Sequence, residues 1–120
     1  MAAARKLPLA KRAVPRRVTF GVFATGDPRI DQPSRTRATN IVQMTAEAIA
    51  QGVRMPDGSP ANVVWTPVLV DGEPQADIVA QQFKDEGVDV LVCAPDTWAF
   101  PQLSLSSLVS QFPKDTPLNL

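Results

Sequence analysis

The 120-residue sequence contains no histidine, no tyrosine and only one cysteine, Cys93. Histidine carries most general acid–base catalysis near neutral pH and most transition-metal sites, so catalysis here would have to rest on Asp, Glu, Lys or Arg. A single cysteine excludes an internal disulfide and fits a reducing compartment. The cytoplasm is the simplest interpretation. Because Cys93 lies in an apolar run, we expect an inert thiol in the core.

Long hydrophobic runs are also absent. No stretch approaches the ~20 apolar residues that a membrane-spanning helix needs, so we expect no membrane partner. The hydrophobic fraction of 44% and the charged fraction of 20% are typical of a soluble globular protein. The length is sufficient for one small domain.

Acidic residues are missing from the first 17 positions, although the whole chain has a net charge of zero. Residues 1–17 contain half of the twelve basic residues: Arg5, Lys6, Lys11, Arg12, Arg16 and Arg17. The remaining body carries a net charge of −6, which argues against nucleic acid as a partner. We interpret residues 1–17 as a basic disordered leader. A transit peptide is the alternative, but the segment has no serine, and Pro8 and Pro15 interrupt any long helix.

The rest of the sequence alternates between predicted strands and predicted helices. β-branched, apolar runs predict strands at residues 18–24, 62–70 and 88–94, and apolar residues at helical spacing predict helices at 34–52, 74–87 and around 105–112. This alternation predicts an α/β fold: a three-layer, flavodoxin- or Rossmann-like parallel sheet with helices on both faces. We expect the second strand outside the first, and the third on the other side of the first.

Features of the later strands suggest where the sheet ends. Pro67 cannot donate to a sheet ladder, which predicts an edge position for its strand, or an early end to it. We expect Trp65 in the same strand to pack in the core or in an interface. Residues 118–120 look like the start of a fourth strand, so we expect residues 18–120 to be an incomplete α/β domain, a fragment of a larger protein.

The expected strand order indicates a binding site. In open parallel sheets, ligands bind outside the carboxyl ends of the strands where the strand order reverses. The loops there contain Asp27 and Arg29 after the first strand, and Asp96 and Trp98 after the third. Guanidinium groups donate to sugar hydroxyls, and an indole face packs on the C–H side of a sugar ring. Two alternatives stay open: Arg29 pairs only with a neighbouring carboxylate, and Trp98 only covers the sheet.

Other chemical motifs are weak or missing. The loop after the first strand has only Gly26, so neither the dinucleotide fingerprint nor the Walker phosphate loop is present. Asp27 and Asp96 are two carboxylates without a defined spacing, which is weak evidence for a cation site. The serines near residues 104–110 have no histidine partner for nucleophilic catalysis.

At these same loops the sequence resembles the N-terminal domain of the L-fucose isomerase family. The resemblance covers residues 20–120, without any single motif that is highly specific. The stretches that carry it are Phe20-Gly21-Val22-Phe23 followed by Gly26-Asp27-Pro28-Arg29-Ile30-Asp31, Asp57-Gly58-Ser59-Pro60, Phe83 through Val90, and Ala94-Pro95-Asp96-Thr97-Trp98-Ala99-Phe100.

The resemblance implies a manganese-dependent aldose–ketose isomerase of L-fucose- or D-arabinose-like sugars, with three-domain subunits assembled as a hexamer. The Mn²⁺ ligands, two carboxylates and a histidine, would belong to later domains. We therefore expect no cofactor, no metal site and no catalytic residue in this chain, which alone would be inactive. Arg29 and Trp98 match residues that the first domain lends to the substrate site of a neighbouring subunit, and we add Asp27 and Asp96 as substrate-binding candidates.

Two other functions remain open. The chain could be a non-catalytic sugar-binding or sensing α/β module, which would share the parallel sheet and the loop-borne arginine and tryptophan. It could also be a purely structural assembly domain in which both loops serve packing.

Overall fold

The computed structural model describes residues 17–94 and 104–119. All but the last residue of the predicted leader therefore lies outside the described residues. The elements follow one another as β1 (Thr19–Thr25), α2 (Gln32–Gly52), β2 (Asn62–Val70), α3 (Glu73–Asp85), β3 (Val90–Cys93), α4 (Leu105–Val109) and β4 (Leu118–Asn119).

The strands form one parallel sheet in the order β2-β1-β3-β4. This confirms the α/β fold class and the predicted placement of β2 and β3 on opposite sides of β1. β4 pairs with β3 through Leu91–Leu118 and Val92–Asn119, so the segment predicted to begin a fourth strand does join the sheet. No helix in the described part of the chain is both long and apolar enough to cross a membrane.

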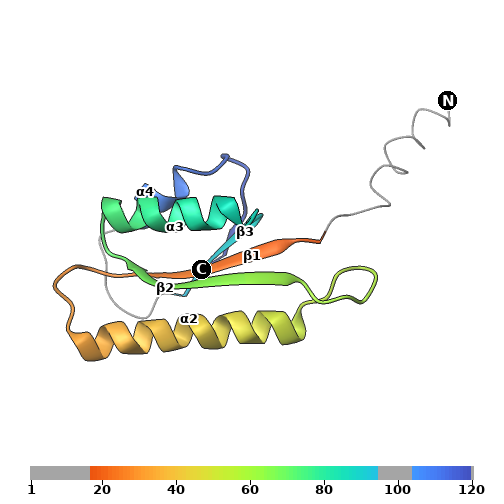
Figure 1. Cartoon of the computed structure of the whole chain (residues 1–120), viewed down its shortest axis with the longest axis horizontal. Helices are drawn as coiled ribbons and strands as arrows, with labels where there is room; N and C mark the ends of the chain where they lie inside the picture. Colours follow the sequence, from red (N-terminus) through yellow and green to blue (C-terminus); the bar gives the residue numbers. More distant parts are fainter. Residues whose placement is uncertain (1–16, 95–103, 120) are drawn as a thin grey trace.

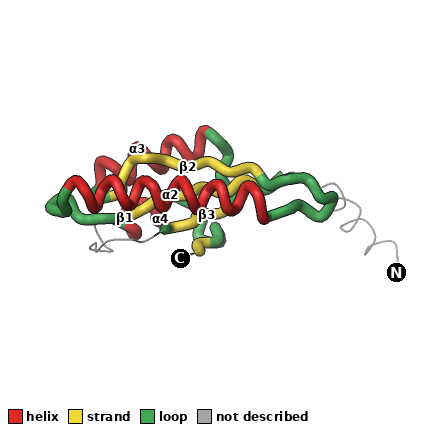
Figure 2. Tube along the Cα trace, turned by 90° about the horizontal axis from the view of Figure 1, so that it is seen from below, coloured by secondary structure: helices red, strands yellow, loops and turns green. Residues whose placement is uncertain are grey.

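Helices cover both faces of the sheet, with α2 on one side and α3 and α4 on the other (Figure 1). Figure 2 shows α2 lying along the strands in the view from below. Neighbouring residues of β1 point to opposite faces, as a strand requires: Val22 packs in the α2 core and Phe23 in the α3 core. The face of α3 that packs on the sheet consists of the buried residues Ala76, Val79, Ala80 and Phe83.

β2 is an edge strand, as Pro67 predicts, but it continues through the proline to Val70. Its pairing with β1 shifts around Pro67, because Val22 pairs with Trp65 whereas Ala24 pairs with Leu69. This irregularity accommodates a residue that cannot donate to the ladder. Trp65 is 38% exposed, so its predicted place in the core is wrong, and the interface alternative stays a prediction.

Several element boundaries differ from the prediction, and two of them have clear local causes. α2 begins at Gln32 rather than residue 34, because the Asp31 side chain accepts from the Ser34 N–H at 2.9 Å and caps the helix. β3 begins at Val90 rather than residue 88, because the Val88 N–H donates to the carbonyl of Phe83 at 3.0 Å and completes the end of α3.

Candidate functional site

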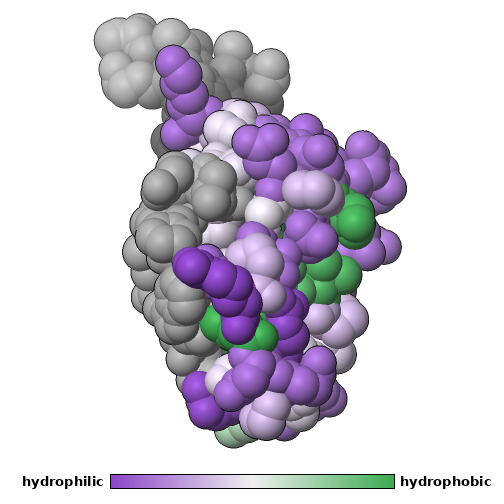
Figure 3. Space-filling model, turned by 90° about the vertical axis from the view of Figure 1, so that its left-hand side faces the viewer, coloured by the Kyte–Doolittle hydropathy of each residue, from purple (hydrophilic) through white to green (hydrophobic). Residues whose placement is uncertain are grey.

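The strand order reverses between β1 and β3, and the loop of residues 26–31 leaves the carboxyl end of β1 at that point. Its first residue, Gly26, donates its N–H to the carbonyl of Val70 at 3.0 Å, which ties the loop to the end of β2. Figure 3 faces this end of the molecule, where most of the coloured surface is hydrophilic. The loop predicted to carry a site therefore lies at a polar sheet end where α/β proteins bind ligands.

Asp27 and Arg29 form a close ion pair within this loop. The Asp27 carboxylate accepts from the backbone N–H of Arg29 at 2.9 Å, from its Nε at 2.8 Å and from its Nη2 at 3.3 Å. These bonds from Arg29 hold the pKa of Asp27 below its usual value, and the carboxylate in turn raises the pKa of Arg29. Asp27 is therefore ionised and bound to Arg29 at neutral pH.

The two partners differ in exposure. The side chain of Asp27 is 4% exposed, whereas that of Arg29 is 69% exposed. A buried carboxylate thus orients the Arg29 side chain, most of which stays accessible to solvent. A hydrogen-bond donor that is both oriented and accessible suits recognition of sugar hydroxyls. The pairing of Arg29 with a neighbouring carboxylate, which the sequence left as an alternative, is present.

Asp31 has a structural role at the other end of the loop. Its side chain accepts from Ser34 as the N-cap of α2, and this hydrogen bonding lowers the pKa of Asp31. Asp31 therefore fixes where the loop becomes helix, and it is Asp27 that pairs with Arg29.

Arg35 is a residue that the sequence reasoning missed. It extends from the first turn of α2 and its Nη2 donates to Asp71 Oδ2 at 3.0 Å and to the carbonyl of Pro28 at 3.0 Å. Asp71 directly follows β2 and is largely buried, with 10% of its side chain exposed. A carboxylate next to an apolar strand needs a partner, so Asp71 is the signal in the sequence that could have pointed to Arg35.

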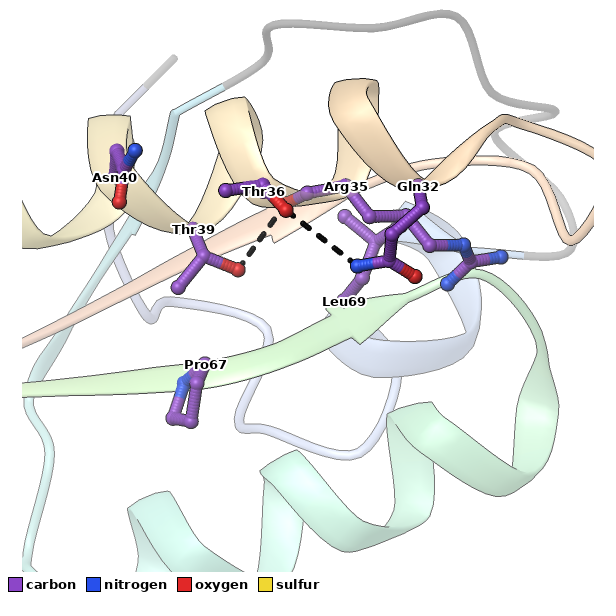
Figure 4. A pocket seen from close by; sticks show the side chains of 7 residues that line it. All are labelled: Gln32, Arg35, Thr36, Thr39, Asn40, Pro67 and Leu69. Carbon is purple, nitrogen blue, oxygen red and sulfur yellow. Dashed lines mark hydrogen bonds between the residues drawn. The ribbon is translucent and has the colours of Figure 1, made fainter.

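A polar groove of about 310 Å³ lies between the N-terminal part of α2 and the strand β2 (Figure 4). Arg35 extends along its rim toward the end of β2. The groove opens beside β2, on the far side of β1 from the reversal point, so it does not coincide with the predicted site. Its lining residues are Gln32, Arg35, Thr36, Thr39, Asn40, Pro67 and Leu69.

The remaining candidates are distributed as follows. Asp96 and Trp98 lie outside the described residues, so their convergence with Arg29 stays a prediction. Cys93 is 3% exposed, and burial raises the pKa of its thiol, which confirms it as a core residue.

In the described part of the chain no three His, Cys, Asp or Glu side chains gather as a metal site would need. The described residues therefore do not fit a Mn²⁺ centre.

Comparison with known proteins identifies the family. Residues 17–120 match the family model described as L-fucose isomerase, first N-terminal domain. A comparison with curated proteins finds no match. The match covers every described residue, including the Asp27–Arg29 loop, Arg35 and all four strands. The chain therefore belongs to the L-fucose isomerase family, as its first N-terminal domain.

Proposed function

We propose that this domain serves a metal-dependent aldose–ketose isomerase of L-fucose- or D-arabinose-like sugars by supplying substrate contacts. Its family is an isomerase family, which gives the reaction class. The observation that carries the proposal is the accessible Arg29 guanidinium, held by the buried Asp27 at the carboxyl end of β1. In this proposal Arg29 donates hydrogen bonds to sugar hydroxyls, and Trp98 packs against the ring.

Asp27 has a different place in the proposal from the one its position in the sequence suggested. Its carboxylate is buried and already accepts three hydrogen bonds from Arg29. It therefore acts by orienting Arg29, and the sugar meets the guanidinium rather than the carboxylate. Asp96 remains a proposed substrate contact in the loop after β3.

Proton transfer between neighbouring sugar carbons is assigned to the rest of the enzyme. The chain has no histidine, and Mn²⁺, which would hold two adjacent sugar oxygens in the parent enzyme, finds no fitting ligand set among the described residues. We propose that the longer, cytoplasmic enzyme provides these groups, and that the site is shared between neighbouring subunits of a homo-oligomer. The 120-residue chain alone is then inactive.

A kinetic experiment tests the substrate contacts. The isomerase that carries this domain is assayed with Mn²⁺ on L-fucose and D-arabinose, as wild type and as the Arg29→Gln and Trp98→Ala variants. We expect kcat/KM to fall by about 10- to 100-fold in each variant, mainly through KM, because oriented contacts to the sugar are lost.

Arg54→Gln is the matched control. Arg54 is also an exposed arginine, and its side chain donates to the carbonyl of Ala50 at the opposite end of α2. Its loss should leave turnover unchanged. Wild-type turnover in both Arg29→Gln and Trp98→Ala would contradict the proposed contacts and leave the structural assembly role. Tight sugar binding by the 120-residue chain alone would favour a binding module instead.

A further inference from the structure

Arg35 connects three segments of the chain through a single guanidinium nitrogen. Its Nη2 lies 3.0 Å from Asp71 Oδ2, 3.0 Å from the Pro28 carbonyl and 3.4 Å from the Asp27 carbonyl. Its side chain is 28% exposed, so much of it is packed against its surroundings. One arginine of α2 thus joins the loop after β1 to the residue that follows β2.

The two carbonyls that Arg35 contacts immediately precede Arg29. The loop is anchored at its start by the bond from Gly26 to Val70, and at its end by the Asp31 cap. Between these anchors, the backbone has no regular secondary structure. The Arg35 contacts therefore hold the stretch of backbone from which both Asp27 and Arg29 project.

We propose that Arg35 is a positioning residue, which fixes the Asp27–Arg29 pair at the substrate site by tying its backbone to Asp71. This inference rests on the proposed function, since it is Arg29 that would meet the sugar. Asp27 orients the Arg29 side chain, whereas Arg35 holds the backbone that carries the Asp27–Arg29 pair. Asp27 and Arg35 thus position the same guanidinium, one through a side-chain contact and the other through the loop backbone.

Asp71 gives the tether a rigid end. It directly follows β2, and its side chain is almost as buried as the core. The planar guanidinium reaches the carboxylate and the loop carbonyls from one fixed position, which an ammonium on a flexible stem reproduces poorly. Lysine at position 35 should therefore retain the charge and still loosen the loop.

The first test measures the loop itself, in the 120-residue chain. Hydrogen exchange is followed at the amides of Arg29 and Ile30, which donate to the side chain and the carbonyl of Asp27. We expect several-fold faster exchange at both amides in Arg35→Gln, and also in Asp71→Asn, which releases the tether from its other end. Amides of β1 and β3 should exchange as in wild type, which shows that the variants are folded.

The second test measures turnover in the isomerase that carries this domain, with L-fucose and D-arabinose. We expect Arg35→Gln to reduce kcat/KM by about 10- to 100-fold, with most of the change in KM, because a displaced donor binds the sugar less well. Arg35→Lys should recover only part of this loss. The Arg29→Gln/Arg35→Gln double variant should be no worse than Arg29→Gln, since Arg35 acts through Arg29.

The outcomes separate this inference from the proposed function. Unchanged loop exchange in both Arg35→Gln and Asp71→Asn would overturn the tether. So would wild-type kinetics in Arg35→Gln when Arg29→Gln is impaired. Wild-type kinetics in Arg29→Gln would overturn the sugar contact, while faster loop exchange in Arg35→Gln would still support the tether. Arg54→Gln serves as the control in both tests, because the Arg54 side chain donates to the carbonyl of Ala50 near the end of α2, away from the loop after β1.

Discussion

Gly21 of β1 lies directly beneath the ring of Phe83 in α3. A Cβ atom at position 21 would be 2.8 Å from two ring carbons of Phe83 and 2.9 Å from Cγ1 of Val88. Both neighbours belong to or flank the core on the α3 side, and Phe83 is fully buried. The absence of a side chain at residue 21 therefore sets how closely α3 approaches the sheet.

We expect Gly21→Ala to destabilise the chain by about 1–3 kcal/mol, because the added methyl group overpacks this contact. Urea unfolding measures the change. Gly52→Ala is the matched control, since a Cβ there meets no atom within 4 Å, and it should raise the free energy of unfolding by ~0.4–1 kcal/mol. Equal effects of the two substitutions would show that the Gly21–Phe83 contact is not limiting.

Phe83 itself should account for much of the stability of the α3 layer. It is fully buried and meets Phe23 edge-to-face, with ring centroids 6.3 Å apart. We expect Phe83→Ala to cost about 3–5 kcal/mol, measured by urea unfolding. Ile78→Ala on the same helix changes a side chain that is 49% exposed, and should stay within about 0.5 kcal/mol of wild type. A small loss at Phe83 would mean that the core collapses around the cavity.

The Asp27–Arg29 pair should make the stability of the domain fall in acid. The bonds from Arg29 lower the pKa of Asp27 in the folded state, so the unfolded chain binds the proton more readily. The stabilisation is complete above the unfolded pKa of about 3.9 and is lost as the pH falls through the lower folded value. Urea unfolding in pH steps below about 5 should show a shallower decline for Asp27→Asn, and likewise for Arg29→Gln. Curves parallel to wild type would contradict the ion pair.

Cys93 should be almost unreactive in the folded chain. Its side chain is buried, and burial raises the pKa of the thiol, so little thiolate is present and reagents cannot reach it. We expect labelling by a disulfide reagent at pH 8 to be slower than in urea by roughly a thousandfold or more. Rapid labelling without urea would place the thiol at the surface.

The sheet could be predicted closely from the sequence, because buried parallel strands are apolar and bounded by turn residues. The predicted bounds of β2 agree with the observed Asn62–Val70, and the crossover rules gave the correct strand order. The errors lie at element boundaries that are set by a side-chain cap or by a backbone hydrogen bond after a helix. The cap by Asp31 moved the start of α2, and the bond from Val88 to Phe83 delayed β3.

The site was predictable only in part. The rule for open parallel sheets predicted that Asp27 and Arg29 lie at the carboxyl end of β1, beside the point where the strand order reverses, and the structure has them there. Their different exposures could not be read from positions two residues apart in a turn. Arg35 and Asp71 are 36 residues apart and belong to different elements, so only the packing of α2 beside the end of β2 brings them together. Trp65 was misplaced because its strand is an edge, whose side chains face fewer neighbours.

The irregular pairing around Pro67 affects how the domain behaves in concentrated solution. An edge strand presents backbone donors and acceptors that recruit further strands and lead to aggregation. β2 offers no backbone donor at Pro67, and the Thr66 hydroxyl already accepts from the Val68 N–H at 3.1 Å. A foreign strand laid along β2 could not form a continuous ladder across residues 66–68. The same proline that marks this edge of the sheet therefore opposes growth of the sheet beyond β2.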